Sequence, residues 1–435
     1  LAENSFHFLY SRLMNSAFKY LQERGAIENT TSDDLAEFLS TPRSFYIGFD
    51  PTKNSLHLGS LVGIVVAKQL QRYGHTPYLL IGGATARNGD PSGKTVEREK
   101  ISEEQIEENI ARLRQFFFKI FPPTNDANSP MILNNHAWFS QLSAIDFLRD
   151  LGKDFRLGPM LSKESVQIRL QGEGMSFCEF AYPLLQAQDF LHLFQEGVTL
   201  QIGGSDQWGN MVSGIELIRR KQGKKARALT FPLLTSADGK KLGKTEQGAI
   251  WLDESLLSPY GFYQSLLQVG DQDVLVLLKL LTFLPLDQIG SIEKQMDLPD
   301  AIPNRAQTIL AQEVTRFVHG EKGLIRAMRA TEIARPGKNA ALTGDALAAM
   351  AQDLPCVDLD EIVGLSFVEL AFQAGLVRSK SEAARLVKSR GAYLNNQRVE
   401  KPDYTLSQED LVEERFVLLS SGKKNRRIVR LTKNS

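Results

Sequence analysis

The chain has 435 residues, of which 42% are hydrophobic and 23% are charged. These are ordinary values for a globular protein, and the length predicts two or three domains. No stretch approaches the roughly 18 uninterrupted apolar residues of a membrane span. Cys178 and Cys356, the two cysteines, are too few and too far apart for a disulfide scaffold or a Cys-rich zinc site. We interpret both as buried thiols in a reducing compartment.

The formal net charge is zero, but the charge is unevenly distributed along the chain. Residues 365–435 contain 14 Lys and Arg against 8 Asp and Glu, a net charge of +6. This leaves 37 against 43, a net charge of −6, for residues 1–364. A basic C-terminal segment therefore follows an acidic body, so nucleic acid stays among the partners to consider. The first six residues have no basic segment followed by an apolar run, so no targeting peptide is expected.

The first half of the chain predicts alternating strands and helices. Two β-rich runs, 44–49 and 77–81, flank the segment 61–73, which has apolar residues at helical spacing. A strand, a helix and a strand joined by short links form a βαβ unit, so we predict a Rossmann-like α/β domain with a parallel sheet. We also expect helices at 97–121 and 180–194 and a strand at 198–202, whereas residues 122–180 give no clear pattern.

The second half predicts a helical region and then a small mixed module. The pattern is helical over 259–335, and the Gly, Pro and Asp residues of 336–359 indicate a linker. Beyond the linker, helices at 367–374 and 381–388 and strands near 392–394 and 416–418 predict an α+β module. The predicted domains are 1–258 (Rossmann-like, with an N-terminal helical segment and an inserted connective region), 259–335 (α-helical), 336–359 (linker) and 360–435 (α+β).

A glycine-rich stretch, Asn88 to Thr95, follows the second predicted strand. It is close to the pattern of a phosphate-binding P-loop but misses it by one position, because the first required glycine falls on Asn88. We therefore do not predict a P-loop. Four glycines between residues 82 and 93 still let the backbone approach a ligand at the end of this strand, where open α/β sheets bind substrates.

The segment SLHLGS at 55–60 joins the first predicted strand to the following helix. A helix N-terminus offers N–H groups and a positive dipole to phosphate, Gly59 admits a base or ribose, and His57 can donate to charge that grows on phosphates. Taken alone, a histidine before a helix is more often a cap or a core residue. Both interpretations stay open for this segment by itself.

A second segment, ADGKKLGKT at 237–245, places lysines around glycines in an irregular stretch. Ammonium groups on such a loop can meet pyrophosphate as it leaves ATP, without binding ATP tightly beforehand. In isolation, an exposed basic turn is the more common explanation of such a run.

Together the two segments resemble the HIGH and KMSKS signatures of class I aminoacyl-tRNA synthetases. Further motifs look like those of the tyrosyl-tRNA synthetase family of the bacterial and organellar type. They are YIGFDPT at 46–52, GGAT at 82–85, GDPSGK at 89–94, LQAQDF at 185–190 and QIGGSDQWGN at 201–210. With the C-terminal module, the resemblance runs from about residue 10 to residue 430.

This resemblance implies a two-step reaction. Tyrosine and ATP give tyrosyl-adenylate and pyrophosphate, and the tyrosyl group then passes to the 3′ end of tRNA(Tyr). The substrate carboxylate itself attacks the α-phosphate, so no covalent nucleophile is needed and positioning and electrostatics supply the rate. Mg²⁺ is expected with ATP rather than at a ligand cluster of the chain, and no tightly bound cofactor is expected. The family also implies a homodimer, formed through the connective region.

The resemblance assigns substrate-binding residues. At tyrosine they are Tyr46 and Asp189 for the phenol, Asp90, Tyr182 and Gln186 for the ammonium group, and Gln207 for the carboxyl end. Near the ribose or adenosine they are Asp50, Gly59, Gly204 and Asp206. Near the phosphates they are Thr52, His57, Lys94, Arg98, Lys241, Lys244 and Thr245, and all of these except Thr52 form the expected catalytic group.

The chemistry of a phenol agrees with this assignment. A phenol needs both a donor and an acceptor, and a site whose polar groups stay unpaired with phenylalanine rejects it strongly, a discrimination for which tyrosyl-tRNA synthetases are the standard example. A core aromatic residue is the plain alternative for Tyr46. Two residues depart from the family pattern, since Ser60 replaces the last histidine of HIGH and Ile47 replaces a small polar residue. Both changes alter the expected ribose contacts.

The C-terminal module is similar to an S4-type RNA-binding domain, on the evidence of LVRSKSEAAR at 376–385 and GAYLN at 391–395. Basic residues there are expected to neutralise RNA phosphates, which gives salt-sensitive and largely sequence-independent affinity. These residues are Arg378, Lys380, Arg385, Lys388 and Arg390, together with the run KKNRR at 423–427.

Two alternative functions stay open. A tryptophanyl relative shares the fold, but it is not expected to combine Tyr46 with Asp189 or to carry this basic module. An RNA-binding or splicing factor that has lost catalysis is the other, and the intact residues His57, Asp90, Lys241 and Lys244 argue against it. The expected location is the bacterial cytoplasm, with an organellar matrix as the alternative if a transit peptide has been removed.

Overall fold

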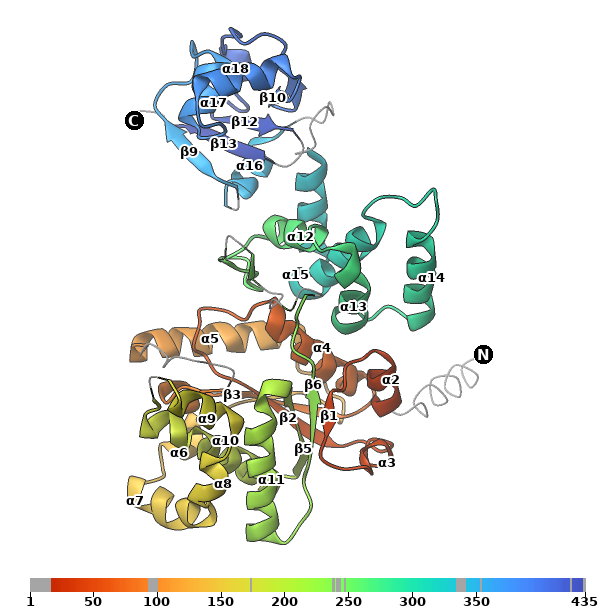
Figure 1. Cartoon of the computed structure of the whole chain (residues 1–435), viewed down its shortest axis with the longest axis vertical. Coiled ribbons are helices and arrows are strands. Elements are labelled where there is room, and N and C mark those ends of the chain that lie inside the picture. Colours follow the sequence, from red (N-terminus) through yellow and green to blue (C-terminus); the bar gives the residue numbers. More distant parts are fainter. Residues whose placement is uncertain are drawn as a thin grey trace. The chain divides into compact units, whose positions relative to one another are not determined.

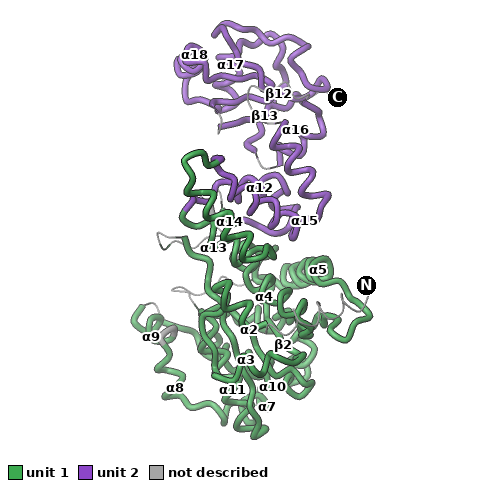
Figure 2. The backbone as a smooth tube through the Cα atoms, turned by 90° about the vertical axis from the view of Figure 1, so that its right-hand side faces the viewer, with its two compact units in different colours: residues 1–249, 272–301 green, residues 250–271, 302–435 purple. Residues whose placement is uncertain are grey.

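The chain divides into two compact units, residues 1–249 with 272–301 and residues 250–271 with 302–435 (Figure 2). The computed structural model describes residues 17–92, 101–172, 174–236, 239, 244–245, 248–333, 342–352, 354–422 and 425–432. Across these residues, no helix has both the length and the apolar character that a membrane crossing requires.

A six-stranded sheet lies at the centre of the first unit (Figure 1). The strand order is β1-β6-β5-β2-β3-β4, and all neighbours are parallel except β1 and β6. The predicted parallel α/β sheet is therefore confirmed. The chain order reverses between β2 and β5, the place where such sheets bind ligands. The strands are β1 (Asn29–Thr30), β2 (Ser44–Phe49), β3 (Thr76–Ile81), β4 (Met131–Asn134), β5 (Val198–Gly204) and β6 (Arg227–Phe231).

Helices cover both faces of this sheet, as alternate side chains of β2 demonstrate. The ring of Tyr46 contacts Phe190 of α10 (Phe177–Gln195), with ring centroids 5.3 Å apart. The next residue, Ile47, faces α4 (Leu58–Arg72), where a Cβ on Gly63 would lie 2.8 Å from Ile47 Cδ1. Glycine at position 63 therefore lets α4 pack closely on the sheet. Phe49 lies on the same face as Ile47 and contacts Phe117 of α5 (Glu103–Ile120).

The region between β3 and α10 differs most from the predictions. The helix α5 begins at Glu103, where the Ser102 hydroxyl accepts the Gln105 N–H, so it begins later than the predicted residue 97. Residues 122–180, which give no clear sequence pattern, contain β4 and several short helices. The short helices are α6 (His136–Phe139), α7 (Ala144–Asp146), α8 (Leu157–Leu161) and α9 (Glu164–Leu170).

The two cysteines differ from their prediction. Cys178 is exposed and Cys356 is half-buried, so the prediction of two buried thiols is wrong.

Arg24 joins the N-terminal helices of the first unit to its distant segment 272–301. The Arg24 side chain is almost fully buried beside the C-terminal end of α13 (Asp271–Leu281). Its guanidinium donates to four backbone oxygens there, those of Leu278, Lys279, Thr282 and Leu284. The last carbonyls of a helix lack an amide partner within it, so the guanidinium caps this end of α13, where the Leu278 oxygen also accepts the Thr282 hydroxyl. The other helices of this unit are α2 (Ala17–Glu23), α3 (Leu35–Phe38), α11 (Trp208–Gln222) and α14 (Leu286–Met296).

The second unit combines helices with a five-stranded sheet of order β11-β10-β12-β13-β9. Helix α12 (Pro259–Leu267) packs along α15 (Arg305–Ile333), which kinks at Gly320, where φ is 73°. The sheet strands are β9 (Cys356–Leu359), β10 (Ala392–Leu394), β11 (Gln397–Arg398), β12 (Phe416–Ser421) and β13 (Asn425–Leu431). Helices α16 (Gly344–Met350), α17 (Phe367–Gln373) and α18 (Lys380–Lys388) complete the unit.

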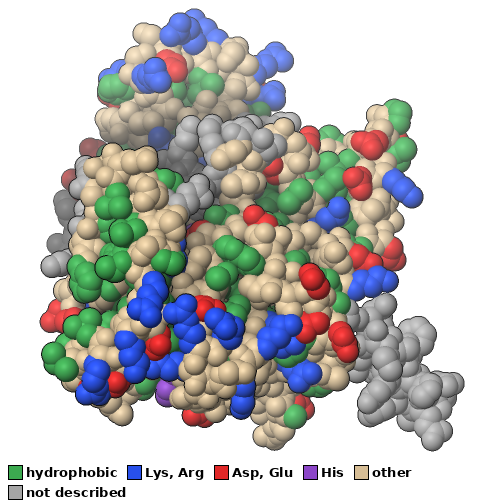
Figure 3. Space-filling model, turned by 60° about the horizontal axis from the view of Figure 1, so that its bottom comes forward, with side chains coloured by type: hydrophobic (Ala, Val, Ile, Leu, Met, Phe, Trp, Pro, Cys, Tyr) green, Lys and Arg blue, Asp and Glu red, His purple; other side chains and the backbone are tan. Residues whose placement is uncertain are grey.

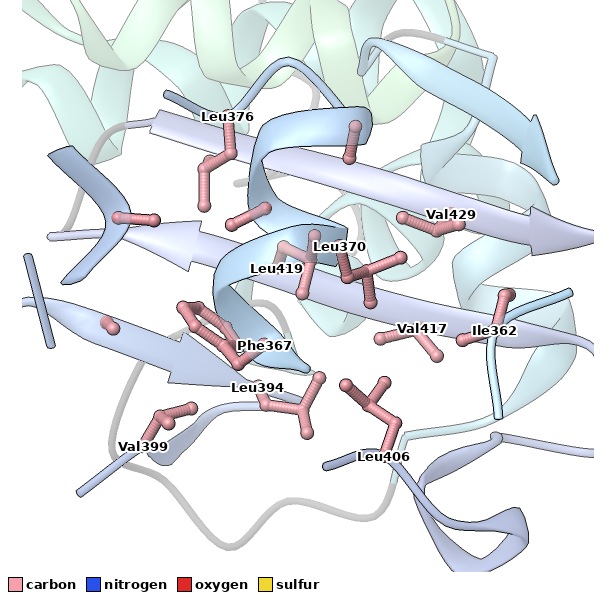
Figure 4. Close-up of a cluster of buried hydrophobic side chains, with 14 of the residues drawn as sticks. Ile362, Phe367, Leu370, Leu376, Leu394, Val399, Leu406, Val417, Leu419 and Val429 are labelled. Atoms are coloured by element: carbon pink, nitrogen blue, oxygen red, sulfur yellow. The ribbon is translucent and has the colours of Figure 1, made fainter. Parts of the chain in front are cut away.

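Both faces of this second sheet are buried. On one face, Phe367 and Leu370 of α17 lie against Val417 and Leu419 of β12 (Figure 4). On the other face, the alternate residues of β12 and β13 pack with α16 and with Tyr260 and Ala330 of the long helices. The sequence predicts a linker at 336–359, but the described part of this segment contains α16 and β9. The strand β9 pairs with β13 as a parallel edge strand of the sheet.

Candidate active site

A cavity of about 430 Å³ opens at the carboxyl ends of β2 and β5. Twelve of the predicted tyrosine and ATP residues line it, which are Tyr46, Asp50, Thr52, His57, Gly59, Asp90, Tyr182, Gln186, Asp189, Gly204, Asp206 and Gln207. Lys94, Arg98 and Lys241 lie outside the described residues. Lys244 and Thr245 form the short strand β7 (Lys244–Thr245), paired with β8 (Gly248–Ala249), and their side chains are outside the description.

One end of the cavity holds Tyr46 and Asp189 in a largely apolar environment. Tyr46 is only 1% exposed, and its hydroxyl has no hydrogen-bond partner among the described residues. Asp189 accepts hydrogen bonds from Trp138 Nε1 at 2.9 Å and from Asn135 Nδ2 at 3.1 Å. Burial raises the pKa of Asp189 to about 8, and the two donors oppose this shift. A buried hydroxyl and a buried carboxyl thus face the same space.

Asp50 follows β2 and lies between two hydroxyl groups. The Tyr182 hydroxyl donates to its Oδ2 at 2.7 Å, and the Thr85 hydroxyl donates to its Oδ1 at 2.6 Å. Burial, followed by the nearby Asp50 and Asp90 carboxylates, raises the pKa of Tyr182 well above its usual value. Tyr182 therefore stays protonated and acts as a donor throughout the physiological range.

Asp90 belongs to a second polar group of the cavity wall, and Asn210 supports this group from behind. Asp90 accepts the Gln207 side-chain N–H at 2.7 Å and the Ser92 backbone N–H at 3.0 Å. Asn210 Nδ2 lies 3.1 Å from Gln186 Oε1 and 3.2 Å from Ser92 Oγ. The side chains of Gln186, Gln207 and Asp90 therefore share one hydrogen-bonded cluster. Asn210 was not predicted as a site residue, although the motif at 201–210 contains it.

His57 is the N-cap of α4, as the plain interpretation of the sequence expects. Its Nδ1 accepts the Gly59 N–H at 3.0 Å. A neutral imidazole whose Nδ1 accepts carries its proton on Nε2. Because His57 also lines the cavity, this cap fixes a ring that can donate from Nε2. The two interpretations of the segment are therefore compatible.

A buried ion pair supports the helix that carries Tyr182, Gln186 and Asp189. Arg169 of α9 donates to Glu179 of α10 at 2.8 and 3.2 Å, and both side chains are 2% exposed. The Arg169 Nε also donates to the Gly174 carbonyl at 3.1 Å. This pair fixes the first turns of α10 just before the cavity residues.

Three residues in or beside the cavity, Asn135, Trp138 and Gln201, were not predicted as site residues. Asn135 and Trp138 lie in the region that gave no sequence pattern, so only the hydrogen bonds to Asp189 reveal them. Gln201 lines the cavity, and its buried Oε1 has no partner within the described part of the chain. The two departures from the family pattern, Ile47 and Ser60, also line the cavity. Both positions therefore face the cavity, and their effect on the ribose contacts stays a prediction.

The predicted RNA-binding residues lie on or beside α18 in the second unit. Arg378, Lys380, Arg385, Lys388 and Arg390 are all exposed. Lys380 pairs with Glu369 at 2.5 Å, which partly neutralises it. In the basic run 423–427, the first two lysines lie outside the described residues, and Arg426 donates to the Tyr260 hydroxyl. Arg426 therefore has a structural contact within its own unit.

Two family models match the chain. Residues 40–334 match the model described as tRNA synthetases class I (W and Y). Residues 346–429 match the model described as Tyrosine--tRNA ligase SYY-like C-terminal domain. Together the two matches span both compact units.

Curated relatives and a solved structure agree with the family models. The chain is 49% identical to the chloroplastic/mitochondrial tyrosine-tRNA ligase of Arabidopsis thaliana, over 95% of this chain and 83% of that protein. It is 45% identical to the tyrosine-tRNA ligase of Protochlamydia amoebophila, over 96% and 99%. A C-terminally truncated mitochondrial tyrosyl-tRNA synthetase of Aspergillus nidulans matches at 31% identity and a TM-score of 0.64, covering 73% of this chain and 94% of that one.

Proposed function

Because the chain belongs to the class I tRNA synthetase family of the tryptophan and tyrosine enzymes, we propose that it is a tyrosine-tRNA ligase. The observation that carries the amino-acid assignment is the buried pair of Tyr46 and Asp189. A bound phenol accepts from the unpartnered Tyr46 hydroxyl and donates to Asp189, whose carboxyl oxygens have lone pairs beyond the two used by Trp138 and Asn135. Phenylalanine leaves the Tyr46 hydroxyl unpaired and offers Asp189 no further hydrogen bond, and the indole of tryptophan offers only a donor.

The rest of the cavity suits the remaining groups of tyrosine and ATP. Asp90, with Tyr182 and Gln186 nearby, provides a negative and polar wall for the ammonium group, and Gln207 lies beside it for the carboxyl end. Asp50, Gly59, Gly204 and Asp206 would take the ribose and adenine. Thr52 and His57, with Lys94, Arg98, Lys241, Lys244 and Thr245, would take the phosphates.

The proposed chemistry is two displacements without a covalent enzyme intermediate. A tyrosine carboxylate oxygen attacks the α-phosphorus of ATP, and the bond to the bridging oxygen breaks to release pyrophosphate. His57, with its proton on Nε2, donates to the phosphate oxygens as their charge grows. A terminal ribose hydroxyl of tRNA(Tyr) then attacks the tyrosyl carbonyl, and AMP leaves.

Mg²⁺ would enter this site as the complex of ATP and would neutralise part of the phosphate charge. Among the described residues, no group of three or more His, Cys, Asp or Glu side chains could hold a metal ion. Omission of Mg²⁺ should abolish exchange of pyrophosphate into ATP, whereas tyrosine binding measured by calorimetry should persist.

Tyrosine-dependent exchange of labelled pyrophosphate into ATP tests the proposed function. We expect exchange with tyrosine and none above background with phenylalanine or tryptophan. Tyr46→Phe should lower kcat/KM for tyrosine about tenfold and reduce discrimination against phenylalanine. Tyr263→Phe, at a buried tyrosine of the second unit, is the matched control and should change neither value. Exchange with tryptophan alone would favour the tryptophanyl alternative, and no exchange would favour an RNA-binding factor.

The basic residues of α18 support tRNA as the partner of the second step. The double variant Arg385→Glu and Lys388→Glu should raise the KM for tRNA(Tyr) at least tenfold and leave pyrophosphate exchange unchanged. Lys119→Glu, at an exposed lysine of α5, is the matched control. An equal loss of exchange and charging would count against a separate RNA-binding domain at 360–435.

An exposed apolar surface on the connective region supports the homodimer. Phe177, Ile145 and Leu157 are 73%, 69% and 66% exposed, and a hollow of about 380 Å³ lies beside Phe177. Figure 3 shows hydrophobic side chains gathered at the left of the face that it presents. Apolar area of this kind is typical of protein interfaces. Phe177→Asp should give a monomer in light scattering, and Val276→Asp, at another exposed apolar residue, should not.

The compartment follows from the relatives only in broad terms, because they include bacterial and organellar enzymes. We propose the bacterial cytoplasm, with the organellar matrix as the alternative. Microscopy of the native protein with a specific antibody would distinguish the two.

A further inference from the structure

Four polar side chains connect the two ends of the cavity through hydrogen bonds. Asp50, Thr85 and Asn135 follow the neighbouring parallel strands β2, β3 and β4, so their side chains meet at one edge of the sheet. Asp189 reaches the same place from α10. We call Asp50, Thr85, Asn135 and Asp189 the relay. All three of its contacts lie between 2.6 and 3.1 Å.

The direction of every hydrogen bond in the relay is fixed. Asn135 Oδ1 accepts the backbone N–H of Ala84 at 2.7 Å, which determines where its amino group points. One N–H of that group donates to Asp189, and the other donates to the Thr85 oxygen at 3.1 Å. Since the Thr85 oxygen accepts this bond, its single proton goes to Asp50 at 2.6 Å. Thr85 and Asn135 are both buried, so water does not replace these partners.

Gly82 makes the contact between Thr85 and Asp50 sterically possible. A Cβ at this position would lie 1.9 Å from Asp50 Oδ1 and 2.3 Å from Thr85 Oγ1. Any side chain here would therefore push apart the two atoms that share the proton. Both are side-chain atoms, so they can move without displacing the backbone. The GGAT segment at 82–85 thus builds the relay at the end of β3.

We propose that Thr85 and Asn135 are positioning residues that hold the phenol-binding carboxyl Asp189 and the nucleotide-side carboxylate Asp50 in a common arrangement, so that each substrate favours binding of the other. This inference rests on the proposed function. Neither residue needs to touch a substrate, because each acts through a carboxyl group. The relay is the shortest hydrogen-bonded connection between the two carboxyl groups in the described part of the site.

The test is Thr85→Val in the full-length chain, which removes the hydroxyl and keeps the shape. We expect the KM values for tyrosine and for ATP each to rise about tenfold in pyrophosphate exchange, because Asp50 loses its Thr85 donor and Asn135, the donor to Asp189, loses its Thr85 acceptor. Thr85→Ser should restore both values to within about twofold. Thr315→Val, at a buried threonine whose hydroxyl has no partner among the described residues, is the matched control and should be unchanged.

A binding measurement separates positioning from simple structural support. In the wild type, tyrosinol, a tyrosine analogue without the reacting carboxylate, should lower the dissociation constant of ATP, and ATP should lower that of tyrosinol by the same factor. Thr85→Val should bring this factor close to one. Gly82→Ala is the second variant, for use if Thr85→Val does not fold. Its added Cβ displaces Asp50 Oδ1 and Thr85 Oγ1, so it should also bring the factor close to one.

The comparison variant Trp138→Phe removes a donor from Asp189 outside the relay. It should raise the KM for tyrosine and leave that for ATP within about twofold. The proposal is overturned if Thr85→Val and Gly82→Ala keep wild-type KM values and coupling, or if they lower only the melting temperature. It is also overturned if serine fails to rescue. Absence of tyrosine-dependent exchange in the wild type would instead contradict the proposed function.

Discussion

Replacing Asp189 with asparagine should make the folded protein more stable at neutral pH. Burial raises the pKa of this carboxyl to about 8, whereas the unfolded chain releases the same proton near pH 4. Between these values the unfolded state binds fewer protons, so stability falls as the pH rises, by about 1.4 kcal/mol per pH unit. At pH 7 the carboxyl therefore destabilises the fold by about 4 kcal/mol, a cost that asparagine does not carry.

Asparagine also loses a hydrogen bond. Trp138 and Asn135 donate to different oxygens of Asp189, and an amide has only one oxygen. One buried donor is left unpaired, which costs about 1 to 3 kcal/mol. The net expectation is a variant about 2 kcal/mol more stable than the wild type at pH 7 and about equal to it near pH 5.

Urea unfolding without substrates, followed by tryptophan fluorescence from pH 5 to pH 8, measures this difference. Asp126→Asn, at an exposed aspartate, is the control and should differ from the wild type by the same amount at every pH. A variant at position 189 that is less stable than the wild type throughout this range would refute the reasoning. So would a difference that does not change with pH.

Three further predictions concern buried charged and titratable groups. Glu179→Gln leaves the Arg169 guanidinium buried without its counter-charge and should cost about 3 to 5 kcal/mol in urea unfolding, whereas Arg169→Met with Glu179→Leu should cost far less. Burial lowers the pKa of His75 to about 4, so its contribution to stability, about 3 kcal/mol, should be lost as the pH falls from 6.5 to 4. His75→Asn keeps an acceptor for the Arg43 N–H and should flatten that dependence in the same assay. Arg24→Lys should lower the melting temperature measurably, since an ammonium group cannot reach all four carbonyl oxygens, and an unchanged value would contradict the capping role.

The sequence predicts those parts of the fold whose signals are local. The strands at 44–49 and 77–81 have regular apolar runs, and the structure has β2 and β3 at nearly these positions. The strand β4 has four residues, of which none is fully buried, so it gives no such run. The strand β9 pairs with residues about seventy positions later, and a partner that distant leaves no local pattern.

The difference between local patterns and contacts of distant residues also applies to the site. Motifs name Tyr46, Asp50 and Asp189, and the structure brings them to one cavity. Asn135 and Trp138 belong to no motif, and their contribution depends on contacts with Asp189 across more than fifty residues. His57 shows a different limit of prediction from sequence. A helix cap and a donor to phosphate can both be a histidine at this position, so the sequence does not distinguish the two roles.

The contact of Arg24 with α13 has a consequence for folding during synthesis. The guanidinium and its four carbonyl acceptors are separated by 254 to 260 residues. At about 5 to 20 residues per second, the ribosome makes these acceptors roughly 10 to 50 s after Arg24. All six strands of the first sheet are complete before then, so the sheet can assemble on the ribosome while Arg24 is still in water. The capture of α13, which carries the chain back after its excursion through residues 250–271, is then a late step of this unit's folding.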